Sequence, residues 1–203
     1  MGQKRRGRGN IASRFTPLFN NSRNSSPDVG PSEGNEMNQQ DLDKILKLHA
    51  LWLQGNKDGE KANLQKANLQ KANLREANLR KADLQKADLR GANLRLIDLR
   101  NANLHGANLY KANLEGGDLR KADLRGTDLR NANLQGSNLW EADLRNADLR
   151  GVNLREVDLW NTILYGADLR KADLRGARLW GCLLHGATLW DPGIQDTKKE
   201  VSD

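Results

Sequence analysis

A leucine stands at every fifth position from Leu64 to Leu189, without interruption. The residue two positions before each leucine is alanine in eighteen of the twenty-six repeats, and a small or compact residue in the others. The residue directly before the leucine is Asn or Asp in twenty-two repeats. Internal repetition constrains a fold more than any other sequence property, because every repeat has to bury the same face.

A period of five does not fit a regular helix. On an α-helix, five residues advance about 140° beyond a full turn, so successive leucines would share no face. A coiled coil, with its repeat of about 3.5 residues, fails for the same reason. In a strand, each leucine points the same way as the alanine two positions before it, and the chain has to bend before the next alanine. The pattern therefore predicts a solenoid of short strands and corners, with Leu and Ala inside and stacked coils satisfying the backbone.

A longer period of twenty residues is superimposed on the first. Outward residues in one phase of this period, each following a leucine, are Arg80, Arg100, Arg120, Trp140, Trp160 and Trp180. Ile163 and Leu183, again twenty apart, replace the usual Asn or Asp. Twenty residues correspond to four pentapeptides and four faces per coil. The repeats then form about 6.5 coils, or about 31 Å at a strand spacing of about 4.8 Å.

Units such as KANLQ, GANLR and KADLR, repeated over residues 61–190, resemble the pentapeptide repeat family, whose consensus is A(D/N)LxX. The resemblance implies an all-β, right-handed quadrilateral β-helix with Leu and Ala inside. The segment LHALWLQGNKDGEKANL, which begins at Leu48, is similar to the N-terminal caps of bacterial, often cyanobacterial, members. We therefore expect a solenoid with a short N-terminal capping α-helix.

Four segments follow from the sequence. A polar, Arg-bearing tail over 1–40 is expected to be disordered, because it has too little apolar surface to offset its ordering entropy. A capping helix and linker occupy 41–60, the β-helix 61–190 and a C-terminal tail 191–203. Asn38 is the expected N-cap of the helix and Gly55 its C′ residue. One apolar stripe follows the helix, made of Leu42, Ile45, Leu46, His49, Trp52 and Leu53, and His49 is interpreted as a packed histidine rather than a ligand.

Composition and termini bear on the compartment. The longest apolar run is Ala50 to Leu53, so we expect neither a membrane span nor a signal peptide. Cys182 is the only cysteine, which favours a reducing, cytoplasmic setting. The acid-poor N-terminus also resembles an organelle transit peptide, so organelle or thylakoid targeting stays open. The same basic tail is a candidate arm for nucleic acid or another anionic surface.

Catalytic chemistry finds no support in this pattern, and we expect no enzyme, cofactor or metal site. His105 and His185 share a column but stand four coils apart, about 19 Å at 4.8 Å per coil, too far to act together. Cys182 occupies an inward alanine position, where it is expected to be an inert core thiol. The aspartates form a surface array rather than a carboxylate pair in a cleft.

The leading functional hypothesis is a binding scaffold that contacts a protein partner, with a homodimer through the C-terminal half as one form. It rests on an outward apolar patch on the C-terminal coils, because contiguous exposed apolar patches usually mark interfaces. The competing interpretation is that the tryptophans only stack on one another. The residues are Trp140, Trp160, Trp180, Ile163, Tyr165 and Leu183.

An alternative is a nucleic-acid or anionic-surface binder, because residues 60–190 carry 22 Lys and Arg against 16 Asp and Glu. Its basic columns comprise Arg80, Arg100 and Arg120 and, on another face, Arg90, Arg130, Arg150 and Arg170. An aspartate two residues before each member of the second column favours instead a cross-coil ladder of surface ion pairs. The family resemblance implies one more alternative, a protein that binds DNA gyrase by mimicking DNA with an acidic surface, which the basic balance of this chain opposes.

Overall fold

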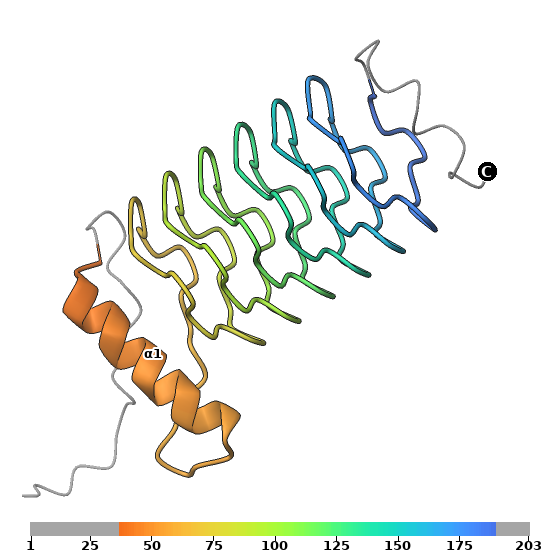
Figure 1. Cartoon of the computed structure of the whole chain (residues 1–203). Coiled ribbons are helices and arrows are strands. Elements are labelled where there is room, and N and C mark those ends of the chain that lie inside the picture. Colours follow the sequence, from red (N-terminus) through yellow and green to blue (C-terminus); the bar gives the residue numbers. More distant parts are fainter. Residues whose placement is uncertain (1–36, 190–203) are drawn as a thin grey trace, which may run out of the picture.

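The computed structural model describes residues 37–189, in which the repeats wind into coils stacked along one axis (Figure 1). Single-residue parallel bridges join positions twenty apart, beginning with Asn63 and Asp83 and ending with Asp168 and Thr188. Within this range the sheet contains no strand longer than one such bridge. The register of twenty places four pentapeptides in each turn of the chain, as the longer sequence period predicts.

Backbone hydrogen bonds join each coil to the next at several points of every repeat. The N–H of Leu104 donates to the carbonyl oxygen of Asp123 (2.8 Å), and the N–H of Asp123 donates back to that of Ala102 (3.0 Å). At the corner, the Gly106 N–H donates to the Arg125 carbonyl (2.8 Å). Because these bonds run between coils, one repeat cannot satisfy its own backbone and stability depends on stacking.

The corner of each repeat depends on two local devices. The second residue after the leucine takes a left-handed conformation, with φ of 62° at Gly126 and 59° at Lys121, and glycine adopts it at no steric cost. The Asn or Asp side chain accepts a hydrogen bond from the N–H two residues on, as at Asp123 Oδ1 and Arg125 (3.2 Å). These side-chain bonds hold the backbone in its bend at each corner.

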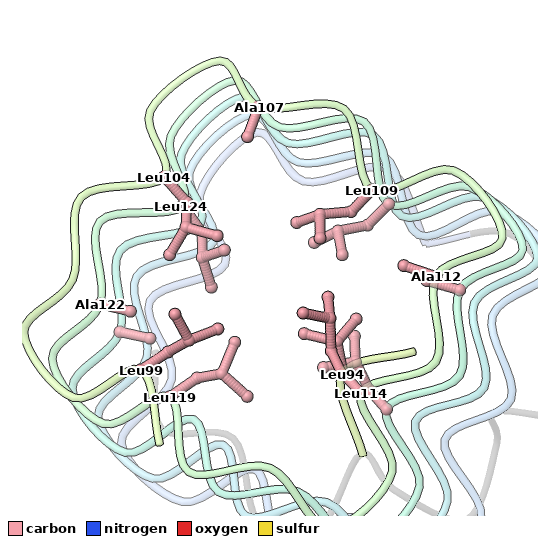
Figure 2. Close-up of a cluster of buried hydrophobic side chains, with 14 of the residues drawn as sticks. Leu94, Leu99, Leu104, Ala107, Leu109, Ala112, Leu114, Leu119, Ala122 and Leu124 are labelled. Carbon is pink, nitrogen blue, oxygen red and sulfur yellow. The ribbon is translucent and has the colours of Figure 1, made fainter. Parts of the chain in front are cut away.

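The core consists of the predicted leucines and small residues. Figure 2 looks into the coil and shows Leu104 beside Leu124 and Leu99 beside Leu119, each pair one coil apart. Ala122 lies between leucine positions and is 1% exposed. Side chains therefore fill the interior, and the alanine positions admit compact residues such as Ile97 and Val152 but leave little space for an aromatic ring.

One helix, α1 (Gln39–Leu53), precedes the repeats and lies beside the first coil, at the N-terminal end of the stack (Figure 1). Asn38 is its N-cap, because its side chain accepts the Asp41 N–H (2.9 Å), and Gly55 follows its end with φ of 74°. Both capping predictions are confirmed. The helix begins at Gln39, so it includes residues that the sequence interpretation assigned to the tail.

Helix α1 contacts the first coil through side chains, and Met37, directly before the N-cap, adds a backbone contact. Leu42 is fully buried and belongs to the same apolar core as the repeats. The Met37 N–H donates to the Asn68 carbonyl (3.0 Å). His49 is fully buried as well, which confirms its interpretation as a packed histidine. Residues 1–36 and 190–203, which hold most of the two expected tails, lie outside the described residues.

Candidate interaction surface

The tryptophans at positions 140, 160 and 180 form one column on the outside of the coils. Each follows a buried leucine, so the alternation of the strand directs it outward. The ring centroids of Trp140 and Trp160 lie 5.4 Å apart, as do those of Trp160 and Trp180, and both pairs are stacked. Trp160 is 37% exposed and Trp180 is 61% exposed. The rings therefore stack on one another and still present apolar surface to solvent.

Charged side chains lie beside Trp140, at the N-terminal end of this tryptophan column. The Lys121 ammonium lies 5.6 Å from the Trp140 ring centroid and 3.2 Å from Glu141 Oε2. Trp140 is half-buried, and its indole Nε1 is buried without a hydrogen-bond partner in the described part of the chain. Trp140 thus serves as the base of the stack, whereas the exposed surface belongs mainly to Trp160 and Trp180.

The adjoining face carries the other predicted patch residues. Ile163 and Leu183 pair as a parallel bridge between neighbouring coils; Ile163 is half-buried and Leu183 is 44% exposed. Tyr165 is 40% exposed, and its ring lies perpendicular to the His185 ring at a centroid distance of 6.2 Å. The structure therefore assembles two groups, the tryptophan stack and the Ile163–Leu183 pair, on faces that meet at one corner. We call the six predicted residues together the aromatic patch.

Three further exposed residues were not assigned to an interaction surface from the sequence. His185 packs against Tyr165, and the twenty-residue period places the two in one column. Leu189, in the last described repeat, is 42% exposed. Leu96 is 48% exposed at a corner with φ of 56°, far along the sequence from the aromatic patch, and a leucine at a corner position is the signal that could have revealed it.

The arginine columns differ from the expected cross-coil ladder. Each of Arg90, Arg130, Arg150 and Arg170 binds the aspartate of its own repeat through two guanidinium nitrogens; in Arg130 these are Nε to Asp128 Oδ1 (2.8 Å) and Nη2 to Oδ2 (2.6 Å). The contact to the next coil is longer, 3.6 Å from Arg130 Nε to Asp148 Oδ2. The ion pairs are therefore formed mainly within a repeat, because the outward Asp and Arg two residues apart lie side by side on one strand.

In the other basic column, too, an arginine is paired only where its own repeat contains an aspartate. Arg100 and Arg120 pair with Asp98 and Asp118 of their own repeats. Arg80 follows Asn78 instead, and its Nε is buried without a hydrogen-bond partner among the described residues. An arginine in this chain is thus neutralised locally wherever its repeat supplies aspartate.

The comparisons with known proteins decide the family. The family model described as pentapeptide repeats matches this sequence in eight copies. The matches cover residues 60–95, 97–126, 127–159 and 153–191, well over half of the chain. The chain belongs to the pentapeptide repeat family. It therefore forms the right-handed quadrilateral β-helix of that family and is a repeat scaffold. No curated protein matches the sequence.

Several solved pentapeptide repeat structures are similar. One from the thylakoid lumen of Arabidopsis thaliana is 27% identical, with a TM-score of 0.46 over 63% of this chain and 75% of that chain. HetL of the cyanobacterium Nostoc, involved in heterocyst differentiation regulation, is 35% identical, with a TM-score of 0.27 over 64% and 73%. QnrB1, a plasmid-mediated fluoroquinolone resistance protein, is 21% identical, with a TM-score of 0.36 over 68% and 73%.

Electrostatics keep the Asp–Arg pairs of this pentapeptide repeat protein ionised. The hydrogen bond from Arg175 lowers the pKa of Asp173 to about 2. Hydrogen bonds from Arg90 and Arg130 likewise lower the pKa values of Asp88 and Asp128. With both partners charged and facing each other, the pairs present a nearly neutral surface.

Reactive groups are few among residues 37–189. No group of three or more His, Cys, Asp or Glu there could hold a metal ion. The Cys182 thiol is buried and lies 2.9 Å from the Leu159 carbonyl oxygen, and burial raises its pKa to about 11. Within the same range, no helix is long and apolar enough to cross a membrane.

Proposed function

We propose that this protein is a non-catalytic scaffold that binds a protein partner through the aromatic patch on its C-terminal coils. The observation that carries the proposal is the stacked tryptophan column whose last member, Trp180, is 61% exposed. Leu183 and Tyr165 extend the apolar surface onto the adjoining face. Water ordered against such a surface is released when a partner covers it, which supports association.

Stacking alone does not account for this surface. The two ring pairs stabilise the column, since offset aromatic pairs contribute about 0.5–1.5 kcal/mol beyond the area that they bury. Yet exposure increases from the half-buried Trp140 to Trp180, so stacking leaves apolar area uncovered at the C-terminal coils. An aromatic side chain buried at an interface contributes about 1.5–3 kcal/mol. Burial of this remaining apolar area against a binding partner is therefore more favourable than its exposure to water.

A second copy of the chain is the partner that we place first. A two-fold interface pairs one patch with itself, so the patch must not repel its own copy. The aromatic patch meets this condition, because all six of its side chains are uncharged. The rigid coils also present the rings in a fixed geometry, which lowers the entropy lost on association.

Anionic partners receive less support from the same contacts. Each arginine of one basic column already donates hydrogen bonds from two nitrogens to the aspartate of its own repeat. These arginines are Arg90, Arg130, Arg150 and Arg170. A phosphate would have to compete with a carboxylate already in place. Arg80, which has no aspartate in its repeat, is the exception that keeps this alternative open to test.

We further propose the segment layout that accompanies this function. Residues 61–190 form the β-helix of about 6.5 coils at twenty residues each. The capping segment, expected at residues 41–60, begins earlier because α1 begins at Gln39. Its capping of the N-terminal end is supported by the buried Leu42 and by the Met37 bond to Asn68. An end of a β-helix exposes unpaired backbone and leucines, so a cap protects it from pairing with other chains.

Light scattering after size-exclusion chromatography tests the proposed interface. We expect the wild type to exceed the single-chain mass of 22.7 kDa and Trp160→Ser to approach it. Loss of one buried aromatic corresponds to about tenfold or more in affinity. Arg80→Ser, in the same column on the N-terminal coils, is the matched control and should retain the wild-type mass. Equal masses for wild type and Trp160→Ser above 22.7 kDa would place the interface elsewhere.

A further inference from the structure

At the start of the repeats, where α1 and its linker precede the first coil, one side chain of α1 binds two backbone groups that lack the bonds of the repeat pattern. From Lys66 onward the corner N–H donates to a carbonyl nineteen residues on, as Lys81 does to Arg100 (2.9 Å). The inward residue donates to the leucine three positions earlier, as Ala67 does to Leu64 (3.2 Å). At the start of the repeats, the corresponding groups are the Arg80 carbonyl and the Ala62 N–H.

His49 binds both of these groups. Its Nδ1 lies 3.0 Å from the Ala62 N–H, which has to donate because a backbone amide cannot accept. Its Nε2 lies 3.1 Å from the Arg80 carbonyl oxygen, so Nε2 carries the proton and donates. The two partners therefore assign the neutral imidazole, protonated on Nε2 only. The ring is fully buried and stacks on Trp52 at a centroid distance of 5.5 Å.

A second proton has no place in this arrangement. It would add an N–H at Nδ1, directly opposite the Ala62 N–H, and two donors cannot bond each other. It would also create a charge away from water. Burial lowers the pKa of His49, the hydrogen bond to the Arg80 carbonyl partly opposes this shift, and the positive charge of Lys61 adds to it.

The surrounding charges offer no compensation. The first coil contributes Lys61 and Arg80, both cationic, and the linker contributes Glu60, whose side chain is exposed. On α1 the nearest ring is the uncharged Trp52. Among the described residues, no carboxylate acts on the pKa of His49. An imidazolium at this position would therefore lack a counter-ion.

We propose that His49 is an acid-sensitive latch, whose protonation releases α1 from the first coil and uncovers the N-terminal edge of the β-helix. The released edge exposes the Ala62 N–H and the Arg80 carbonyl, together with the Asn68 carbonyl that Met37 covers. Unpaired strand edges of this kind accept another extended chain. The latch thus links pH to the accessibility of one end of the scaffold.

The direction of the pH effect on the latch follows from the lowered pKa of His49. The latched state prefers neutral His49, so its contribution is complete above the unperturbed value of 6.5. As the pH falls from 6.5 towards the lower pKa of the latched state, each pH unit favours release by up to tenfold, because one proton is taken up. Below the latched pKa the effect levels off.

Hydrogen–deuterium exchange of the full chain tests the latch. Amide exchange rates measured between pH 8 and pH 5 are divided by the intrinsic amide exchange rate at each pH. Peptides from residues 101–140 serve as the internal reference. We expect protection of α1 in the wild type to fall by up to tenfold per pH unit below 6.5, relative to the reference. His49→Gln, which can accept and donate but does not titrate, should remove this pH dependence. His185→Gln, on the exposed C-terminal surface, is the matched control and should behave as the wild type.

Two results would overturn the latch: constant relative protection of α1 in the wild type from pH 6.5 to pH 5, or an unchanged pH response in His49→Gln. If glutamine fails to hold α1 at neutral pH, a nitrogen NMR titration of the wild-type ring decides. The latch requires the neutral form protonated on Nε2 and a midpoint below 6.5. A midpoint at or above that value would contradict it.

Discussion

At the scale of the residue, neighbouring positions of one repeat face very different surroundings. Ala122 lies in the filled interior and is 1% exposed, whereas Arg125 lies outside and pairs with Asp123 at 2.6 Å. A large side chain at the first position has to displace leucines of adjacent coils. At the second position it extends into solvent.

We therefore expect Ala122→Phe to destabilise the protein far more than Arg125→Phe. Overpacking of a filled core costs about 1–3 kcal/mol or more, whereas Arg125→Phe removes only an exposed ion pair. Thermal unfolding followed by circular dichroism measures both. Comparable melting temperatures for the two variants would show that the inward and outward faces are misassigned.

At the scale of the element, the leucine period predicts most of the buried side chains of the coils, because it leaves only one geometry in which they share a face. Leu189, in the last described repeat, is exposed instead. The side-chain pairings were less predictable. The spacing places Asp128 and Arg130 on one face, but only rotamers decide that Arg130 lies closer to Asp128 (2.6 Å) than to Asp148 in the next coil (3.6 Å). The two bonds of His49 likewise depend on how α1 meets the first coil, which no local pattern specifies.

Truncation tests α1 as an element. The first described contact is made by Met37, so the cut belongs before it rather than at residue 40, which would remove the N-cap Asn38. We expect deletion of residues 1–36 to leave the melting temperature nearly unchanged. Deletion of residues 1–53 should expose the first coil and cause aggregation, measured by light scattering. A soluble rod of equal stability after the longer deletion would contradict the capping role of α1.

At the scale of the whole molecule, the β-helix separates stability from recognition. Stability resides in leucines and alanines inside, whereas the outward residues are free to differ from coil to coil. One column accordingly changes from arginine in its first three coils to tryptophan in the last three. The Asp–Arg pairs keep most of the outer surface polar and locally neutral. The aromatic patch is consequently the surface that distinguishes the C-terminal coils.

Sedimentation velocity of the double variant Trp160→Ser, Leu183→Asp, beside the wild type, tests this account most directly. Circular dichroism of the same samples verifies the fold, and low and high salt separate apolar association from ionic association. We expect the wild type to associate at both salt concentrations and the folded double variant to sediment as a single chain. Unchanged association of a folded double variant, or wild-type association that is lost steeply with salt, would contradict the aromatic patch and favour the arginine columns.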